Sequence, residues 1–187
     1  MRPRLRIAAA ASAAALAISG LGLLAPAASA ADTTVTFSIS GGALSISAPA
    51  TGSLGTVNAS SLLGTGGTLG PTAFSATNTV VTDQRAATPA AWTVGFSSTS
   101  FTTGGATTAE TVANSNVTYL SGTGVVTGTG AFTPGTQKGD GSLPAAGLPK
   151  FLGVGANSVS INPTLTLTLA ANQVAGTYTG TITQSVS

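Results

Sequence analysis

The chain has 187 residues, of which 42% are hydrophobic and only 5% are charged, and it contains 25 glycines but no cysteine and no histidine. A disordered chain is poor in apolar residues and rich in charge, so a folded domain is expected, and the lack of Cys and His excludes disulfides, thiol chemistry and catalysis by either side chain. Six basic residues against four acidic ones are too few to neutralise a phosphate backbone, so nucleic acid is excluded as a partner.

Residues 1–30 have the three parts of a secretory signal peptide in the required order: three arginines, an apolar run over 7–24, and small residues at 28–30. An uncleaved membrane anchor is the alternative, but the break at Pro26 and the Ala-Ser-Ala end favour cleavage. Cleavage leaves residues 31–187 with three basic residues against four acidic ones. We therefore expect a secreted protein with no membrane span after removal of the signal.

The exported part opens on two alternating stretches. Val35, Phe37 and Ile39 alternate with Thr or Ser, and a second alternating stretch covers 43–48. Gly41-Gly42 lies between them, so the pattern predicts a hairpin closed by a glycine turn. After it, residues 51–71 are predicted to be a long connection with one short strand.

Residues 79–98 hold the single tryptophan, and we expect the fold to be organised around them. A strand is predicted to end at Asp83, and Trp92, Val94 and Phe96 are predicted to share one face of the next strand. The polar turn between these strands is consistent with a hairpin or with a strand-loop-strand corner. Asp83 and Arg85 are spaced to form a salt bridge that fixes the turn.

The rest of the chain continues in short strands. A strand is predicted over 116–121, whereas the Gly- and Pro-rich stretch 122–155 is predicted to be the least ordered part. Leu165 and Leu167 belong to an unbroken Leu/Thr alternation and are expected to face the core, and 176–186 is expected to close the fold. Helical periodicity is absent from 31–187, so the sequence predicts one all-β domain: an antiparallel β-sandwich, Ig-like or Greek-key in type, with long Gly/Thr-rich loops.

Two stretches of the sequence resemble the motifs of a known protein family. The stretch 81–85 runs through a turn of small residues into Ala91-Trp92-Thr93-Val94, and 162–167 is followed by 175–183 at the end of the chain. With the opening alternation, this order resembles the WxL domain family of Gram-positive cell-surface proteins, and more closely the WxL-like secreted proteins of high-GC actinobacteria. The tripeptide here has Val94 where the family has Leu, and the second motif lacks its Trp.

The resemblance implies a non-catalytic surface protein that binds non-covalently to cell-wall peptidoglycan or another envelope glycan, with other surface proteins as further candidate partners. The residues that it singles out, as structural or wall-binding positions, are Asp83, Arg85, Trp92, Val94, Leu165 and Leu167.

Other chemistry finds little support in the residues. The four acids are far apart in sequence, and Lys138 and Lys150 lie in Gly/Pro-rich stretches rather than beside a predicted buried serine. The loop 138–141 offers one carboxylate, too few ligands for the 6 to 8 oxygens of a calcium site, and is interpreted as a turn. No enzyme activity, metal or cofactor is predicted.

Two alternatives stay open. Trp92 either packs in the core, with its indole N–H bonded to a backbone carbonyl, or is exposed and stacks on a wall sugar; its apolar neighbours favour the core. The alternative to wall binding is a self-assembling surface or fibre subunit, because so few charges leave edge strands poorly defended against pairing with another copy.

Overall fold

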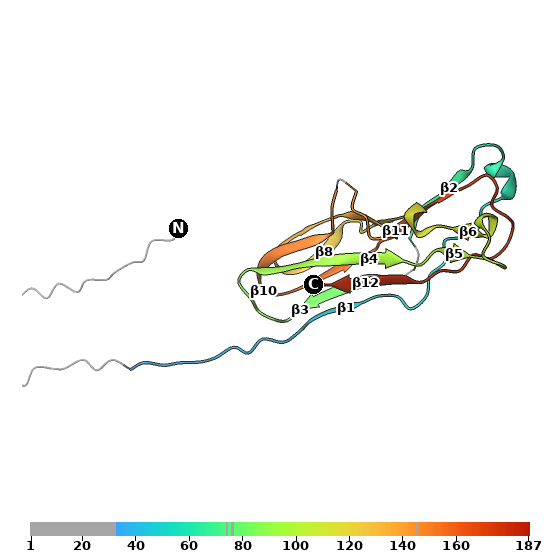
Figure 1. Cartoon of the computed structure of the whole chain (residues 1–187). Helices are drawn as coiled ribbons and strands as arrows, with labels where there is room; N and C mark the ends of the chain where they lie inside the picture. Colours follow the sequence, from blue (N-terminus) through green and yellow to red (C-terminus); the bar gives the residue numbers. More distant parts are fainter. Residues whose placement is uncertain (1–32, 74, 76, 145) are drawn as a thin grey trace, which may run out of the picture. The chain divides into compact units, whose positions relative to one another are not determined.

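A computed structural model describes residues 33–187 except 74, 76 and 145, so the predicted signal peptide lies outside the described residues. Contacts divide the chain into two units, Met1–Phe37 and Ser38–Ser187. All the strands lie in the second unit (Figure 1).

The second unit is built from short strands, and every strand pair is antiparallel. The strands are β1 (Leu44–Ser47), β2 (Gly67–Ala73), β3 (Thr79–Asp83), β4 (Ala90–Ser98), β5 (Phe101–Thr102), β6 (Thr111–Val112), β7 (Val117–Leu120), β8 (Gly124–Thr133), β9 (Thr136–Lys138), β10 (Lys150–Ile161), β11 (Thr164–Leu169) and β12 (Ile182–Val186). Three short 3-10 turns, η1 (Ala59–Leu62), η2 (Thr108–Glu110) and η3 (Asn114–Asn116), join them. The predicted all-β, antiparallel sandwich is confirmed.

The larger sheet has the order β1-β3-β10-β4-β12, with β8 also paired to β10, and a second sheet has the order β2-β11-β7-β9. The long strand β10 connects two parts of the larger sheet: its residues 150–153 pair with β4, and its residues 157–161 pair with β3. Because β3 and β4 pair with different halves of β10 and not with each other, the turn between them is a corner, and the hairpin alternative is wrong.

The apolar side chains form two clusters. One contains Val81, Ala90, Trp92, Val94, Phe151, Val159 and Ile161, and the other contains Phe96, Phe101, Val112, Val117, Tyr119, Leu165 and Leu167. Trp92, Val94 and Phe96 are 3%, 0% and 3% exposed, which confirms that they share the inner face of β4. β4 therefore contributes buried residues to both clusters.

The predicted hairpin over 33–48 is wrong. Residues 33–43 form no strand, and β1 pairs with β3, so that Leu44 and Ile46 pack against the Trp92 cluster. The two glycines serve close approach rather than a turn, since a Cβ at Gly41 would lie 2.5 Å from the carbonyl oxygen of Arg85. The alternation was correctly recognised, but the partner of β1 lies in a distant stretch that local pattern does not reveal.

The expectation of low order over 122–155 is also wrong, because this stretch contains β8, β9 and the start of β10. Its glycines allow tight packing between strands. A Cβ at Gly130 would lie 2.4 Å from the ring of Phe151, and one at Gly124 would lie 2.5 Å from Val159. Glycine inside a strand often marks such a close approach, which composition alone does not distinguish from a loop.

Candidate functional site

The six residues singled out by sequence fall into two groups that do not meet. Asp83 is the last residue of β3, and Arg85 lies in the turn that follows. Trp92 and Val94 lie on the next strand, β4. Leu165 and Leu167 lie on β11 of the other sheet, in the other apolar cluster, and are 0% and 4% exposed as their alternation predicted. Among the six, only Arg85 has a substantially exposed side chain, at 38%.

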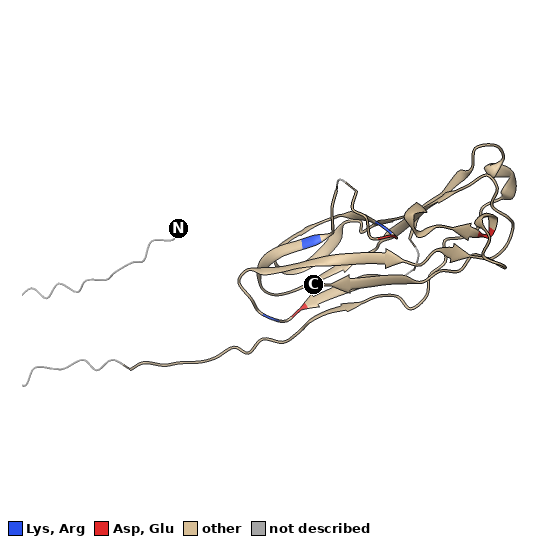
Figure 2. Cartoon of the chain, in the orientation of Figure 1, with Lys and Arg blue, Asp and Glu red and all other residues tan. Residues whose placement is uncertain are grey.

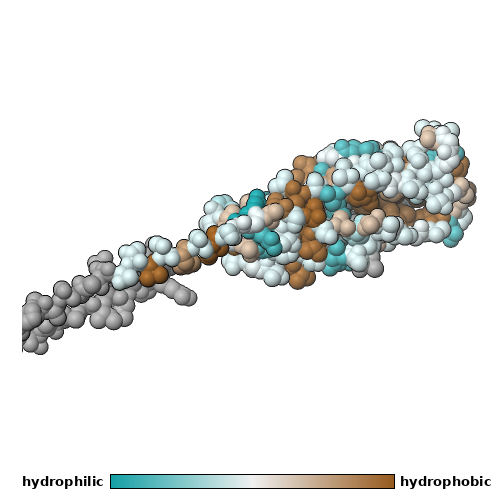
Figure 3. All heavy atoms as spheres, turned by 90° about the horizontal axis from the view of Figure 1, so that it is seen from below, coloured by the Kyte–Doolittle hydropathy of each residue, from teal (hydrophilic) through white to brown (hydrophobic). Residues whose placement is uncertain are grey.

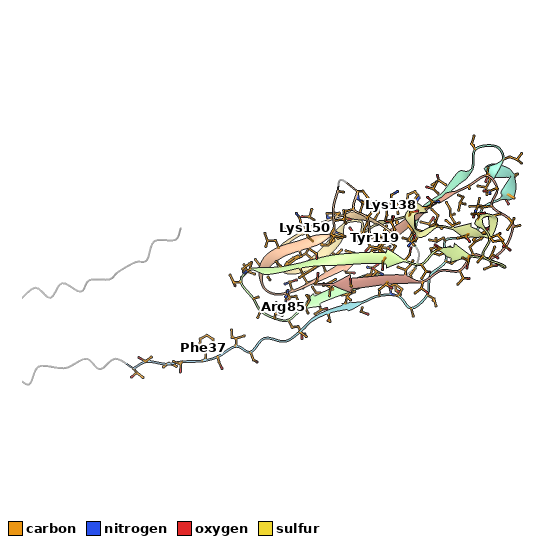
Figure 4. All side chains as sticks on the ribbon, in the orientation of Figure 1. Phe37, Arg85, Tyr119, Lys138 and Lys150 are labelled. Carbon is orange, nitrogen blue, oxygen red and sulfur yellow. The ribbon has the colours of Figure 1, made fainter. Side chains whose placement is uncertain are left out.

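The Asp83 carboxylate is the centre of a polar network at the corner between β3 and β4. It is fully buried and accepts hydrogen bonds from the backbone N–H of Arg85 at 3.0 Å and from Arg85 Nε and Nη2, each at 2.9 Å. Arg85 Nη2 also donates to the carbonyl of Ala91, at 2.9 Å. The predicted salt bridge is therefore present and bidentate, and it ties the turn to β4. Figure 4 shows Arg85 at this corner.

The same network reaches Trp92 through a residue that no local pattern in the sequence singles out. Asn157 of β10 stands opposite Asp83 in the sheet register. Its Oδ1 accepts the indole N–H of Trp92 at 3.0 Å, and its Nδ2 donates to the carbonyl of Gly155 at 3.1 Å. The indole partner is thus a side chain and not the backbone carbonyl that we expected. Only the register of β10 against β3 could have identified Asn157.

Two aromatic rings complete the surroundings of Trp92. Phe151 stacks on the indole with ring centroids 5.3 Å apart, and Phe132 lies tilted at 6.1 Å. Both come from the stretch that was expected to be poorly ordered. With 3% exposure, Trp92 is a core residue and presents no ring face to a ligand. The buried residues at this corner therefore stabilise the β-sandwich.

The hydrogen bonds from Arg85 hold the pKa of Asp83 below its usual range, against the opposing effect of burial. The carboxylate therefore stays ionised and paired, and it is not poised to transfer a proton. Figure 2 shows how few charges the described chain carries. Within 33–187, apart from the three undescribed positions, no group of three or more His, Cys, Asp or Glu side chains could hold a metal ion.

The loop 138–141 is a turn, as expected: Asp140 Oδ1 accepts hydrogen bonds from the backbone N–H and the hydroxyl of Ser142, at 3.0 and 2.7 Å. In the part of the chain that the structure describes, no helix has the length and apolar character needed to cross a membrane.

An open cleft of about 690 Å³ lies at the end of the second unit where β2, β5 and β6 are found (Figure 1). Its apolar wall includes Leu69 of β2 and Phe101 of β5. Tyr178 also lines the cleft, and its hydroxyl lies within hydrogen-bond distance of the carbonyls of Val174 and Ala109, at 2.8 and 3.1 Å. The cleft is assembled from at least four separate stretches, so sequence reasoning did not identify it.

The second exposed feature is the segment before β1, residues 33–40. Val35, Phe37 and Ile39 are 83%, 88% and 79% exposed. No other three alternating apolar residues in the described chain are so exposed. Brown apolar atoms are visible along this segment beside the grey atoms in Figure 3, and Phe37 is labelled in Figure 4. The segment has the alternation of a strand but no strand partner among the described residues. Its backbone N–H and C=O groups and its apolar side chains can therefore contact another molecule.

The chain matches no protein-family model, no curated protein and no solved structure.

Proposed function

We propose that this chain is a secreted, non-catalytic structural subunit of the cell surface, of WxL-like type, that joins its neighbours by strand addition. The observation that carries the proposal is the exposure of Val35, Phe37 and Ile39. These three side chains repeat every second residue, as on the buried face of a strand. Their burial against another molecule would remove the largest exposed apolar run of the described chain from water.

Strand addition also explains the low charge of the protein. Natural sheet edges are commonly protected by lysines, prolines or inward-facing charges. The segment 33–40 and the edge strand β8 contain no charged residue and no proline. Main-chain hydrogen bonds then provide affinity, while the alternating side chains provide selectivity.

The replacement Phe37→Asp tests this proposal. We expect the purified protein from Ala31 to Ser187 to associate as its concentration rises, and the variant to associate at least about tenfold more weakly, since a charge replaces an apolar side chain that must be desolvated. Light scattering over a concentration series measures the difference. Leu143→Asp is the matched control, because Leu143 is also exposed, at 57%, but lies outside the segment. Equal association of wild type and Phe37→Asp would contradict the proposal.

Wall binding is the second candidate function, and the cleft is the observation in its favour. The ring of Tyr178, whose hydroxyl lies within hydrogen-bond distance of two backbone carbonyls, stands next to Thr177 and Thr179 and offers with them the mixture of apolar and polar groups found in small-ligand sites. The buried Trp92 and Leu165 do not offer such a surface.

Co-sedimentation with isolated Gram-positive cell walls tests this second candidate. Saturable pelleting of the wild type that is lost in Thr177→Arg, but retained in Phe37→Asp, is the expected result for glycan in the cleft. Pelleting that follows self-association instead, and is lost in Phe37→Asp, would contradict it.

A further inference from the structure

We infer that the cleft beside β2 and β5 receives Val35, Phe37 and Ile39 of a second copy of this chain. The inference rests on the proposed assembly by strand addition and names its acceptor site. Both partners are uncharged: the segment 33–40 contains only Thr, Ser, Val, Phe and Ile. None of the residues that line the cleft is Lys, Arg, Asp or Glu.

The cleft borders apolar core side chains that are only partly buried. Leu69, Leu169 and Tyr178 are only partly buried where they pack against the cluster that contains Phe101, and all four line the cleft. Apolar side chains that enter here extend an existing core and need no charged partner. The volume of about 690 Å³ is large enough for several side chains.

A backbone edge is also available there. β2 borders the cleft through Leu69 and pairs with β11 on one side. Among the described residues, the other side of β2 has no backbone hydrogen-bond partner. An added strand therefore finds N–H and C=O groups to pair with, next to an apolar wall for its side chains.

The segment cannot reach the cleft of its own molecule. Gly42 is held at the corner by its N–H bond to the Gln84 carbonyl, and this corner lies at the Ala90 end of β4. Phe101, which lines the cleft, comes after the other end of that strand. Nine strand residues span about 30 Å, whereas the residues from Val35 to Gly42 cover at most about 25 Å when fully extended. The occupant must therefore come from another copy, unless β1 leaves the sheet.

The point where the chain enters the second unit and the cleft lie at opposite ends of that unit. The chain enters this unit at the corner near β1 and β3, and the cleft lies near β2, β5 and β6 (Figure 1). A contact between one end of a copy and the other end of the next is heterologous, and such contacts continue into filaments unless the rotation closes a ring. Each copy would supply a strand and accept one.

The edge of β8 is the competing acceptor. Val125 on β8 and Leu152 on β10 are 71% and 63% exposed, so this region also offers apolar surface beside an edge strand. It is a face of the sheet rather than a cleft, however, and it would bury one side of the incoming residues at most. An experiment must distinguish the two acceptors.

Because the chain has no cysteine, disulfide trapping between copies can do so. One copy carries Ser38→Cys within the segment, and a second, size-tagged copy carries either Thr177→Cys in the cleft or Thr129→Cys on β8. After brief oxidation, we expect the Ser38→Cys and Thr177→Cys pair to cross-link about tenfold more than the pair with Thr129→Cys, because docking raises the local concentration of the two thiols. Adding Phe37→Asp to the Ser38→Cys copy should abolish the difference.

Three results would overturn the inference. Preferred trapping at Thr129→Cys would assign the acceptor to β8 while leaving assembly by strand addition intact. Failure to cross-link at Thr177→Cys, with protection of its thiol by soluble wall fragments, would assign the cleft to glycan. If the wild type also fails to associate in light scattering, the proposed function fails together with its acceptor site.

Discussion

Replacing Trp92 by Ala is expected to lower the free energy of unfolding by about 3–5 kcal/mol, the cost of deleting a large buried ring that the core does not refill. Trp92 stacks on Phe151 at 5.3 Å, packs with Phe132, and bonds Asn157 through its indole N–H. The variant loses these contacts and leaves Asn157 Oδ1 without its donor. Since domains of this size have only about 5–15 kcal/mol of stability, much of the variant should be unfolded near physiological temperature.

Urea unfolding followed by far-ultraviolet circular dichroism measures this loss, because the variant has no Trp to report by fluorescence. Trp92→Phe separates the two contributions: it keeps an aromatic ring but leaves the buried oxygen unpaired, at a cost of about 1–3 kcal/mol. Leu143→Ala, at an exposed position, should change stability by less than about 0.5 kcal/mol. An unchanged unfolding midpoint for Trp92→Ala would contradict the core role of this side chain.

Replacing Asp83 by Asn is expected to lower stability at neutral pH by about 2–3 kcal/mol. The buried carboxylate accepts three hydrogen bonds from Arg85, and an amide cannot accept them all. The loss is smaller than for a fully buried pair, because the Arg85 side chain is 38% exposed and is partly stabilised by water.

The stability difference between wild type and Asp83→Asn should also depend on pH. The pKa of Asp83 is lowered by folding, so its contribution is present above the unfolded pKa near 3.9 and is lost as pH falls through the lower folded pKa. The stability difference between wild type and Asp83→Asn should therefore close below about pH 4. Asp140→Asn, which alters an exposed carboxylate whose pKa is also lowered by hydrogen bonds from Ser142, is the control and should show a smaller difference of the same sign. A difference that is equal at pH 2 and pH 7 would contradict the ionic role of Asp83.

Strands whose burial follows a local pattern could be predicted from the sequence. The alternation around Trp92 and the Leu165–Leu167 alternation report which residues face inward, because a strand has a period of two. The salt bridge between Asp83 and Arg85 was also predictable, since the two residues are neighbours. These features need no knowledge of which strand pairs with which.

Pairing across long distances could not be predicted in this way. Asn157 meets Asp83 only because β10 pairs with β3, and the cleft exists only because Leu69, Phe101 and Tyr178 converge from separate strands and loops. The segment 33–40 shows the converse: its pattern predicts a strand, but no described part of its own chain pairs with it. A local pattern that the chain itself does not satisfy is the feature that points to a second molecule.

Sedimentation velocity of the wild-type protein over a hundredfold concentration range tests this central claim most directly. Strand addition from head to tail predicts a boundary that moves to higher sedimentation coefficients as concentration rises, through species that differ by one chain. A single boundary at the mass of one chain, up to the highest concentration, would contradict the claim that residues 33–40 are buried by another copy.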